Sequence, residues 1–150
     1  MKLAEALIQR KDLSSDISDL KTRITNNSLV QEGTDPAEDP EALLLQLYDK
    51  LNRFESMVSR INYTNAIAKI GDITLNEALT KRDNLQLTYT TLSSISNHAS
   101  STVSRYSITE ILNKATIDIQ KLRKKLDKIA EERRKLETKI QSANWTVDLL

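Results

Sequence analysis

The sequence predicts an all-α protein of about four long, antiparallel, coiled-coil-like helices, arranged as a helical bundle or as hairpins. In four stretches apolar side chains recur at spacings of three and four residues, which keeps one narrow side of each helix apolar. The 150 residues include only two glycines and two prolines, and this scarcity of helix breakers indicates long elements. Only 39% of the residues are hydrophobic and 4% aromatic, which suits thin seams between paired helices. We therefore expect a single helical domain over residues 1–150.

The first helix is expected at about residues 2–26, followed by an acidic loop at residues 28–39. Arg10 interrupts the apolar stripe of this helix. The stripe comprises Leu3, Leu7, Leu13, Ile17, Leu20 and Ile24. Asn26 and Asn27 favour termination, because short polar side chains compete for backbone hydrogen bonds. The loop then contains the first glycine, Gly33, and one of the two prolines, Pro36, which is typical of an irregular connection.

The second helix is expected at about residues 40–70. Asp39 can cap its start, and Pro40 then takes the first helical position, where proline is favoured. Asn65 takes one step of a stripe that is otherwise apolar. The stripe comprises Leu44, Leu47, Leu51, Phe54, Val58, Ile61 and Ala68. Gly71 is expected to end the helix.

The third helix is expected at about residues 74–98. Thr74 and Glu77 form the pattern of a capping box, in which the two residues satisfy each other's backbone N–H groups. The apolar stripe comprises Leu75, Leu79, Leu85, Tyr89, Leu92 and Ile95 or Ser96. The serine- and threonine-rich stretch near residues 100–117 fits neither the helical nor the strand period, so an irregular segment is expected there.

The fourth helix is expected at about residues 118–143, with Asp118 as its cap. Arg133 interrupts its stripe. The stripe comprises Leu122, Leu126, Ile129, Leu136, Ile140 and Ala143. An apolar tail, residues 144–150, carries the only tryptophan, Trp145. We expect this tail to fold back as a plug on a helix pair or to dock on a neighbouring subunit.

The charge of the chain is balanced overall but uneven along its length. The net charge is +1, from 22 basic and 21 acidic residues, which does not favour nucleic-acid binding. Residues 31–50 hold six acids and one base, whereas residues 121–139 hold nine bases and four acids. Either these are two solvated faces with local ion pairs, or the two segments meet, within a chain or across an interface. Charge reversal at Lys124, Lys125 and Lys128 distinguishes these interpretations.

Residues with chemical reactivity are scarce. There is no cysteine, which excludes disulfides and thiolate metal sites. The single histidine, His98, lies in a serine-rich stretch and is interpreted as a solvated or helix-capping residue. Gly33 and Gly71 are isolated, so no glycine-rich phosphate loop is present. We therefore predict no catalytic, cofactor-binding or metal site, and no enzymatic activity.

Polar residues inside the stripes are the candidate functional positions. Asn65 and Arg133 fall at seam positions, where a polar side chain commonly fixes helix register or oligomeric state. The alternative is a polar ligand pocket inside an assembly. The neighbours of Asn65 make an unusually polar patch on the second helix. With Trp145, the candidate patch or interface comprises Arg60, Asn62, Thr64, Asn65 and Arg133.

Several short blocks together resemble a septicolysin-like family of small bacterial helical proteins, end to end. The blocks are Met1–Leu7, Asn27–Gly33, Pro36–Pro40, Arg60–Asn62 with Thr64–Asn65, Thr74–Leu79 with Arg82–Asp83, Arg105–Ser107 and Gln141–Thr146. The resemblance implies a helical, coiled-coil-like fold. The family label implies a cytolysin, and the resemblance supplies no catalytic residues to transfer.

The functional prediction is a structural or interaction protein that forms a homo-oligomeric helical assembly, with an unknown protein partner as a further expectation. The first residues, MKLAEALIQRKDL, have no apolar signal-peptide region and resemble the start of a helix, so a cytoplasmic location is expected. Two alternatives remain open. One is a membrane-active, cytolysin-like toxin that refolds amphipathic helices onto lipid. The other is an enzyme whose site is assembled between subunits from arginine, asparagine, threonine and glutamate.

Overall fold

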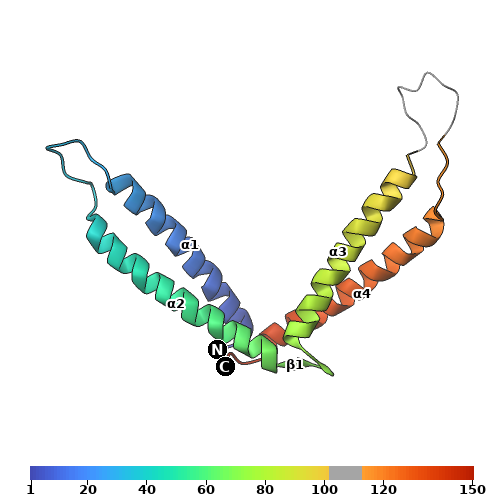
Figure 1. The fold of residues 1–150 in the computed structure, drawn as a ribbon. Helices are drawn as coiled ribbons and strands as arrows, with labels where there is room; N and C mark the ends of the chain where they lie inside the picture. The colour runs from blue at the N-terminus through green and yellow to red at the C-terminus, as the bar shows by residue number, and fades with distance from the viewer. Residues whose placement is uncertain (102–112) are drawn as a thin grey trace, which may run out of the picture. The chain divides into compact units, whose positions relative to one another are not determined.

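The computed structural model describes residues 1–101 and 113–150, and this part of the chain is all-α apart from one pair of two-residue strands (Figure 1). The predicted fold class is thereby confirmed. In chain order the elements are α1 (Leu3–Asn27), α2 (Pro40–Ile67), β1 (Lys69–Ile70), β2 (Ile73–Thr74), α3 (Leu75–Ala99) and α4 (Ile119–Thr146). Most of the irregular segment predicted near residues 100–117 lies outside the described residues. Residues 113–118, which are described, contain neither helix nor strand.

The predicted caps start three of the helices. Asp39 Oδ1 accepts a hydrogen bond from the backbone N–H of Glu41 at 3.0 Å, at the start of α2. Before α3, Thr74 Oγ1 accepts from the Glu77 N–H at 3.2 Å, and Glu77 Oε2 accepts from the Thr74 N–H at 2.7 Å. Asp118 Oδ1 accepts from the backbone N–H of the third residue of α4 at 2.9 Å. Each bond satisfies a helix-terminal donor that would otherwise lack a partner.

Two predicted helix ends are wrong by three residues. The second helix ends at Ile67 rather than at residue 70, because Ala68 is extended (φ −64°, ψ 138°). The following residues form β1, which pairs with β2 across a turn where Gly71 takes a positive φ of 63°, a conformation that favours glycine. The fourth helix continues to Thr146, so its last turn replaces the first part of the predicted tail 144–150.

The chain divides into two units, and each contains one antiparallel helix pair (Figure 1). The first unit, residues 1–69 and 143–150, holds α1 and α2, which are joined by an ion pair of 2.5 Å between Asp16 and Lys50. The second unit, residues 70–142, holds α3 and most of α4, with an ion pair of 2.7 Å between Lys81 and Glu132.

Buried side chains in the two units follow the predicted stripes to different degrees. In α4 four of the six predicted stripe residues, Leu126, Ile129, Leu136 and Ile140, are buried, and Leu122 and Ala143 are half-buried. In α2, the fully buried residues are Leu43, Ile61 and Thr64, so Ile61 alone is shared with the predicted stripe. A helix with one partner buries only a narrow side, and much of the apolar surface of α2 is left partly exposed.

Candidate interaction surfaces

The two ends of the described chain are joined in the first unit by a short antiparallel contact between Lys2 and Asp148. The backbone N–H of Leu3 donates to the carbonyl of Val147, and the N–H of Leu149 donates to the carbonyl of Met1, both at 2.9 Å. We call this contact, together with the α2 side chains that hold it, the terminal clasp. The clasp comprises Met1–Leu3, Arg60, Thr64 and Thr146–Leu150.

Two residues of the predicted polar patch hold the last residue of the chain. Thr64 is fully buried, and its Oγ1 accepts from the backbone N–H of Leu150 at 3.0 Å while donating to the carbonyl of Arg60 at 2.8 Å. Arg60 Nε donates to the carbonyl oxygen of Leu150 at 3.0 Å. Asn62 is exposed and Asn65 is half-buried, and neither side chain hydrogen-bonds to any residue that the structure describes. The patch therefore contributes two residues, Arg60 and Thr64, to a structural contact.

Residues 147–150 of the predicted tail fold back through the clasp, but the side chain that becomes buried is not that of Trp145. Its side chain is 59% exposed at the end of α4, whereas Leu149 is buried. The backbone hydrogen bonds of the clasp hold residues 147–149 beside the start of α1, and in this position the side chain of Leu149 is buried. The alternative expectation, that Trp145 docks on a neighbouring subunit, remains a prediction.

The clasp contains one ion pair whose titration can be followed. Lys2 Nζ lies 2.9 Å from Asp148 Oδ1 and also donates to the carbonyl of Thr146 at 3.0 Å. The hydrogen bond from Lys2, followed by the charge of the same ammonium group, lowers the pKa of Asp148 below its ordinary value. A lowered native-state pKa means that the contact is fully present above the ordinary pKa of aspartate. It is lost as the pH falls through the native-state value.

We expect the Lys2→Gln variant to raise the pKa of Asp148 toward the ordinary aspartate value, because the hydrogen bond and the positive charge that lower this pKa both come from the Lys2 ammonium group. Titration of the Asp148 carboxyl carbon by NMR measures this shift. Lys11→Gln, which removes a lysine of α1 outside the clasp, serves as the control and leaves the titration in place. An unchanged Asp148 pKa in Lys2→Gln contradicts the ion pair.

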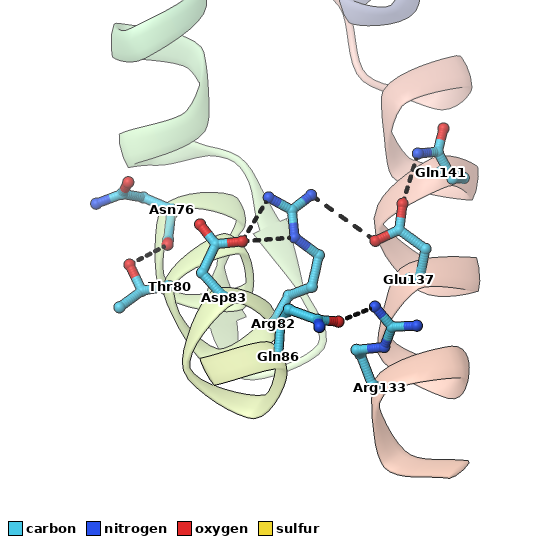
Figure 2. Close-up of polar contacts among 8 residues, drawn as sticks. All are labelled: Asn76, Thr80, Arg82, Asp83, Gln86, Arg133, Glu137 and Gln141. Atoms are coloured by element: carbon cyan, nitrogen blue, oxygen red, sulfur yellow. Dashed lines mark hydrogen bonds and ion pairs between the residues drawn. The ribbon is translucent and has the colours of Figure 1, made fainter. Parts of the chain in front are cut away.

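In the second unit, polar side chains connect α3 to α4 in the region of Arg82 and Arg133 (Figure 2). Arg82 donates to Asp83 Oδ1 at 2.9 and 2.8 Å and lies 3.7 Å from Glu137 on the facing helix. Arg133 donates to the side-chain oxygen of Gln86. Arg133 thus contacts the facing helix, as a residue that sets register must. It belongs to the second unit, whereas the other candidate residues belong to the first.

A groove between α1 and α2 has a volume of about 530 Å³ and carries charges of both signs. Asp12 and Asp16 lie on one wall, and Lys50, Arg53 and Arg60 lie on the other. The Asp16–Lys50 ion pair crosses between the walls, and Arg60 is committed to the clasp. The charges of this groove are therefore partly satisfied within the unit.

A second groove, in the second unit, has an apolar floor and a basic rim. It has a volume of about 720 Å³. Its apolar residues are Leu92, Ile95, Ile117 and Leu122, and its polar residues are Asp118, Lys121, Lys124, Lys125 and Lys128. We call it the lysine-rimmed groove. Sequence reasoning identified the lysines as a charged segment but not the apolar floor, which requires α3 and α4 to lie side by side.

An exposed apolar surface runs along the first half of α2. Leu45 is 71% exposed and Tyr48 is 56% exposed, and Leu51 is also exposed. We call these three residues the α2 stripe. Leu44 and Leu47 beside them are only half-buried by α1. Large apolar side chains that adjoin on one helix face are typical of a surface that contacts another protein.

Neither metal-binding clusters nor membrane spans are found among the described residues. No group of three or more histidine, cysteine, aspartate or glutamate residues is placed to hold a metal ion in residues 1–101 and 113–150. Within the same ranges, none of the helices combines the length and the apolar character needed to cross a bilayer.

Comparison with curated proteins gives no match. A solved structure does match: the crystal structure of a functionally unknown conserved protein from Corynebacterium diphtheriae. That protein is 38% identical in sequence, with a TM-score of 0.91, over 100% of this chain and 99% of the other. The model of a family of unknown function, DUF6847, matches residues 10–149. Because the match spans nearly the whole sequence, the chain belongs to the DUF6847 family.

Proposed function

We propose that this protein is a structural or interaction protein that forms a homo-oligomeric helical assembly in the cytoplasm, the compartment that its sequence predicts. The observation that carries the proposal is the α2 stripe. A second copy that covered it would bury Leu45 and Tyr48, which α1 leaves largely in water. Full burial of one such side chain stabilises an association by roughly 1.5–3 kcal/mol.

The spacing of the stripe supports helix-to-helix packing as the mode of assembly. Leu45, Tyr48 and Leu51 lie three residues apart, so they share one side of α2 over nearly two turns. The half-buried Leu44 and Leu47 widen this side toward α1. Coiled-coil-like pairing of α2 with a second α2 is therefore the arrangement that we propose.

We expect light scattering over a range of concentrations to give a native mass that is a multiple of 17.0 kDa. The double variant Leu45→Lys/Tyr48→Lys is expected to shift the mass toward a single chain, because charged side chains resist burial at an apolar contact. Its circular dichroism should remain helical, since both residues are exposed in the single chain.

A matched control places the same two charges at Asn84 and Asn97, which are exposed polar positions of α3 and lie outside the α2 stripe. The Asn84→Lys/Asn97→Lys variant should keep the native mass. A wild-type mass of one chain at every concentration would contradict the proposal. Retention of the oligomer in the Leu45→Lys/Tyr48→Lys variant would show that α2 is not the contact.

The septicolysin-like resemblance supplies a second candidate, a membrane-active protein. The lysine-rimmed groove is the observation that favours it, because basic surfaces with an apolar floor are attracted to anionic lipid. Dye release from vesicles containing phosphatidylserine is the test. Release by the wild type that disappears in Lys124→Glu/Lys125→Glu/Lys128→Glu would favour this candidate over the assembly.

A further inference from the structure

The lysine-rimmed groove has the chemistry of a site for an apolar segment that carries negative charge. Lys121, Lys124, Lys125 and Lys128 are spaced three, one and three residues apart, which places them on one side of α4. None of the four ammonium groups forms an ion pair with a residue that the structure describes. The one acid at the groove, Asp118, accepts the hydrogen bond that caps α4. An occupant must therefore cover the apolar floor and supply carboxylates to the rim.

The loop between α1 and α2 has the complementary character. Leu29 is 89% exposed and Val30 beside it is also exposed, so two apolar side chains adjoin in water. Glu32 and Asp35 follow within five residues and are exposed. In the part of the chain that the structure describes, neither carboxylate has a hydrogen bond or an ion pair. We call Leu29–Asp35 the acidic loop segment.

This segment is shaped before any partner binds. Gly33 takes a φ of 87°, and the backbone N–H of Thr34 donates to the carbonyl of Gln31 at 3.0 Å. Thr34 Oγ1 donates to the same carbonyl at 2.7 Å. Both bonds close the turn that carries Glu32. A turn that is already formed loses less conformational entropy on binding than a free strand of chain does.

The two other acids of the loop at residues 28–39, Glu38 and Asp39, are already engaged. Glu38 accepts hydrogen bonds from Arg23, and this contact lowers the pKa of Glu38. Asp39 caps α2. Glu32 and Asp35 are therefore the carboxylates of this loop that have no partner among the described residues, and their charge is opposite to that of the four groove lysines.

We infer that the lysine-rimmed groove receives the acidic loop segment of a second copy of this chain. The inference rests on the proposed homo-oligomeric function and names one of its contacts. Leu29 and Val30 cover the apolar floor, and Glu32 and Asp35 face the lysines. The charges supply orientation and choice of partner, so the contact weakens as salt is raised. The groove and the loop segment are different surfaces. In a twofold dimer each copy therefore inserts its loop segment into the groove of the other, so the contact occurs twice. In any larger closed assembly the contact links each copy to the next around a ring.

Charge exchange between the two surfaces tests the contact. The groove variant is Lys124→Glu/Lys125→Glu/Lys128→Glu, and the loop variant is Glu32→Lys/Asp35→Lys. Each variant alone is expected to weaken self-association by at least about tenfold at low salt, because like charges then face each other. An equimolar mixture is expected to restore association, because each variant carries the charge that the other has lost. Sedimentation velocity at low and high salt measures both effects.

The control is Lys11→Glu/Lys21→Glu/Lys139→Glu, which changes the net charge by the same amount at exposed positions outside the groove. It should associate as the wild type does. If the wild type associates and both variants match it, the contact is wrong while the proposed assembly stands. If the wild type remains a single chain, the proposed assembly itself fails. Groove-dependent binding of single chains to phosphatidylserine vesicles would overturn the contact in favour of a lipid surface.

Discussion

Replacement of Ile61 by alanine is expected to lower the free energy of unfolding by about 2–5 kcal/mol. Ile61 lies on α2 and is 1% exposed, so its side chain is surrounded by the interior of the first unit. The loss combines the transfer free energy of the deleted methyl and methylene groups with the cost of the cavity that they leave. This is among the largest effects expected of any single substitution, since the whole domain has a stability of roughly 5–15 kcal/mol.

The same helix offers a matched control. Ile67 is 48% exposed and ends α2, so Ile67→Ala removes the same atoms from a half-solvated place. We expect its effect to lie within roughly 0.5 kcal/mol of the wild type. Urea denaturation followed by circular dichroism gives both values. Equal losses in the two variants would mean that burial in this unit does not distinguish the two positions.

Replacement of Thr64 by valine is expected to lower the free energy of unfolding by about 1–3 kcal/mol. Valine has nearly the shape of threonine but no hydroxyl, so the packing of the buried site is kept. The Leu150 N–H then loses the acceptor that lies 3.0 Å away in the wild type. A donor left without a partner beside a buried site carries its full desolvation cost, unless the last residues separate and return it to water.

Hydrogen exchange distinguishes this loss from a general loss of stability. In Thr64→Val the amides of Leu149 and Leu150 are expected to exchange faster, because the clasp opens more often. The control is Thr22→Val, in which the lost hydroxyl donates only to the carbonyl of Ser18 one turn earlier, on the exposed side of α1. A stability for Thr64→Val equal to that of Thr22→Val would show that the hydroxyl of Thr64 adds nothing to the clasp.

Helix starts could be predicted from the sequence because the capping side chain and the N–H group that it accepts from lie within four residues of each other. Asp39, Thr74 and Asp118 accept hydrogen bonds from N–H groups two or three positions ahead. A rule about neighbouring residues is sufficient for such contacts. The apolar stripe of α4 could also be predicted from the sequence, because a helix that packs against one partner buries one regularly spaced row of side chains.

The terminal clasp could not be predicted by such rules. Lys2 and Asp148 are separated by nearly the whole chain, and nothing in either neighbourhood indicates the other. Arg60 and Thr64 were singled out because they are polar on an apolar helix, but their partner, Leu150, was not foreseen. The burial of Leu149 rather than Trp145 also depends on this long-range contact.

The short strands and the exposed part of α2 show two further limits. Residues 69–70 continue a helical pattern, but pairing with residues 73–74 across Gly71 overrides it. The apolar side of the second helix, which runs from Leu44 to Ala68, was predicted from spacing alone. Spacing shows which side of a helix is apolar, but how much of that side is covered depends on the number of helices that pack against it.

The division of the chain has a consequence for the speed at which each unit can fold. Residues 70–142 are contiguous, so the second unit forms from a single stretch of chain. The first unit combines residues 1–69 with residues 143–150, and the hydrogen bond from the amide of Leu149 to the carbonyl of Met1 closes a loop that contains the whole second unit. Because contacts between residues far apart in sequence are slow to form, the terminal clasp is expected to be among the last contacts made in folding.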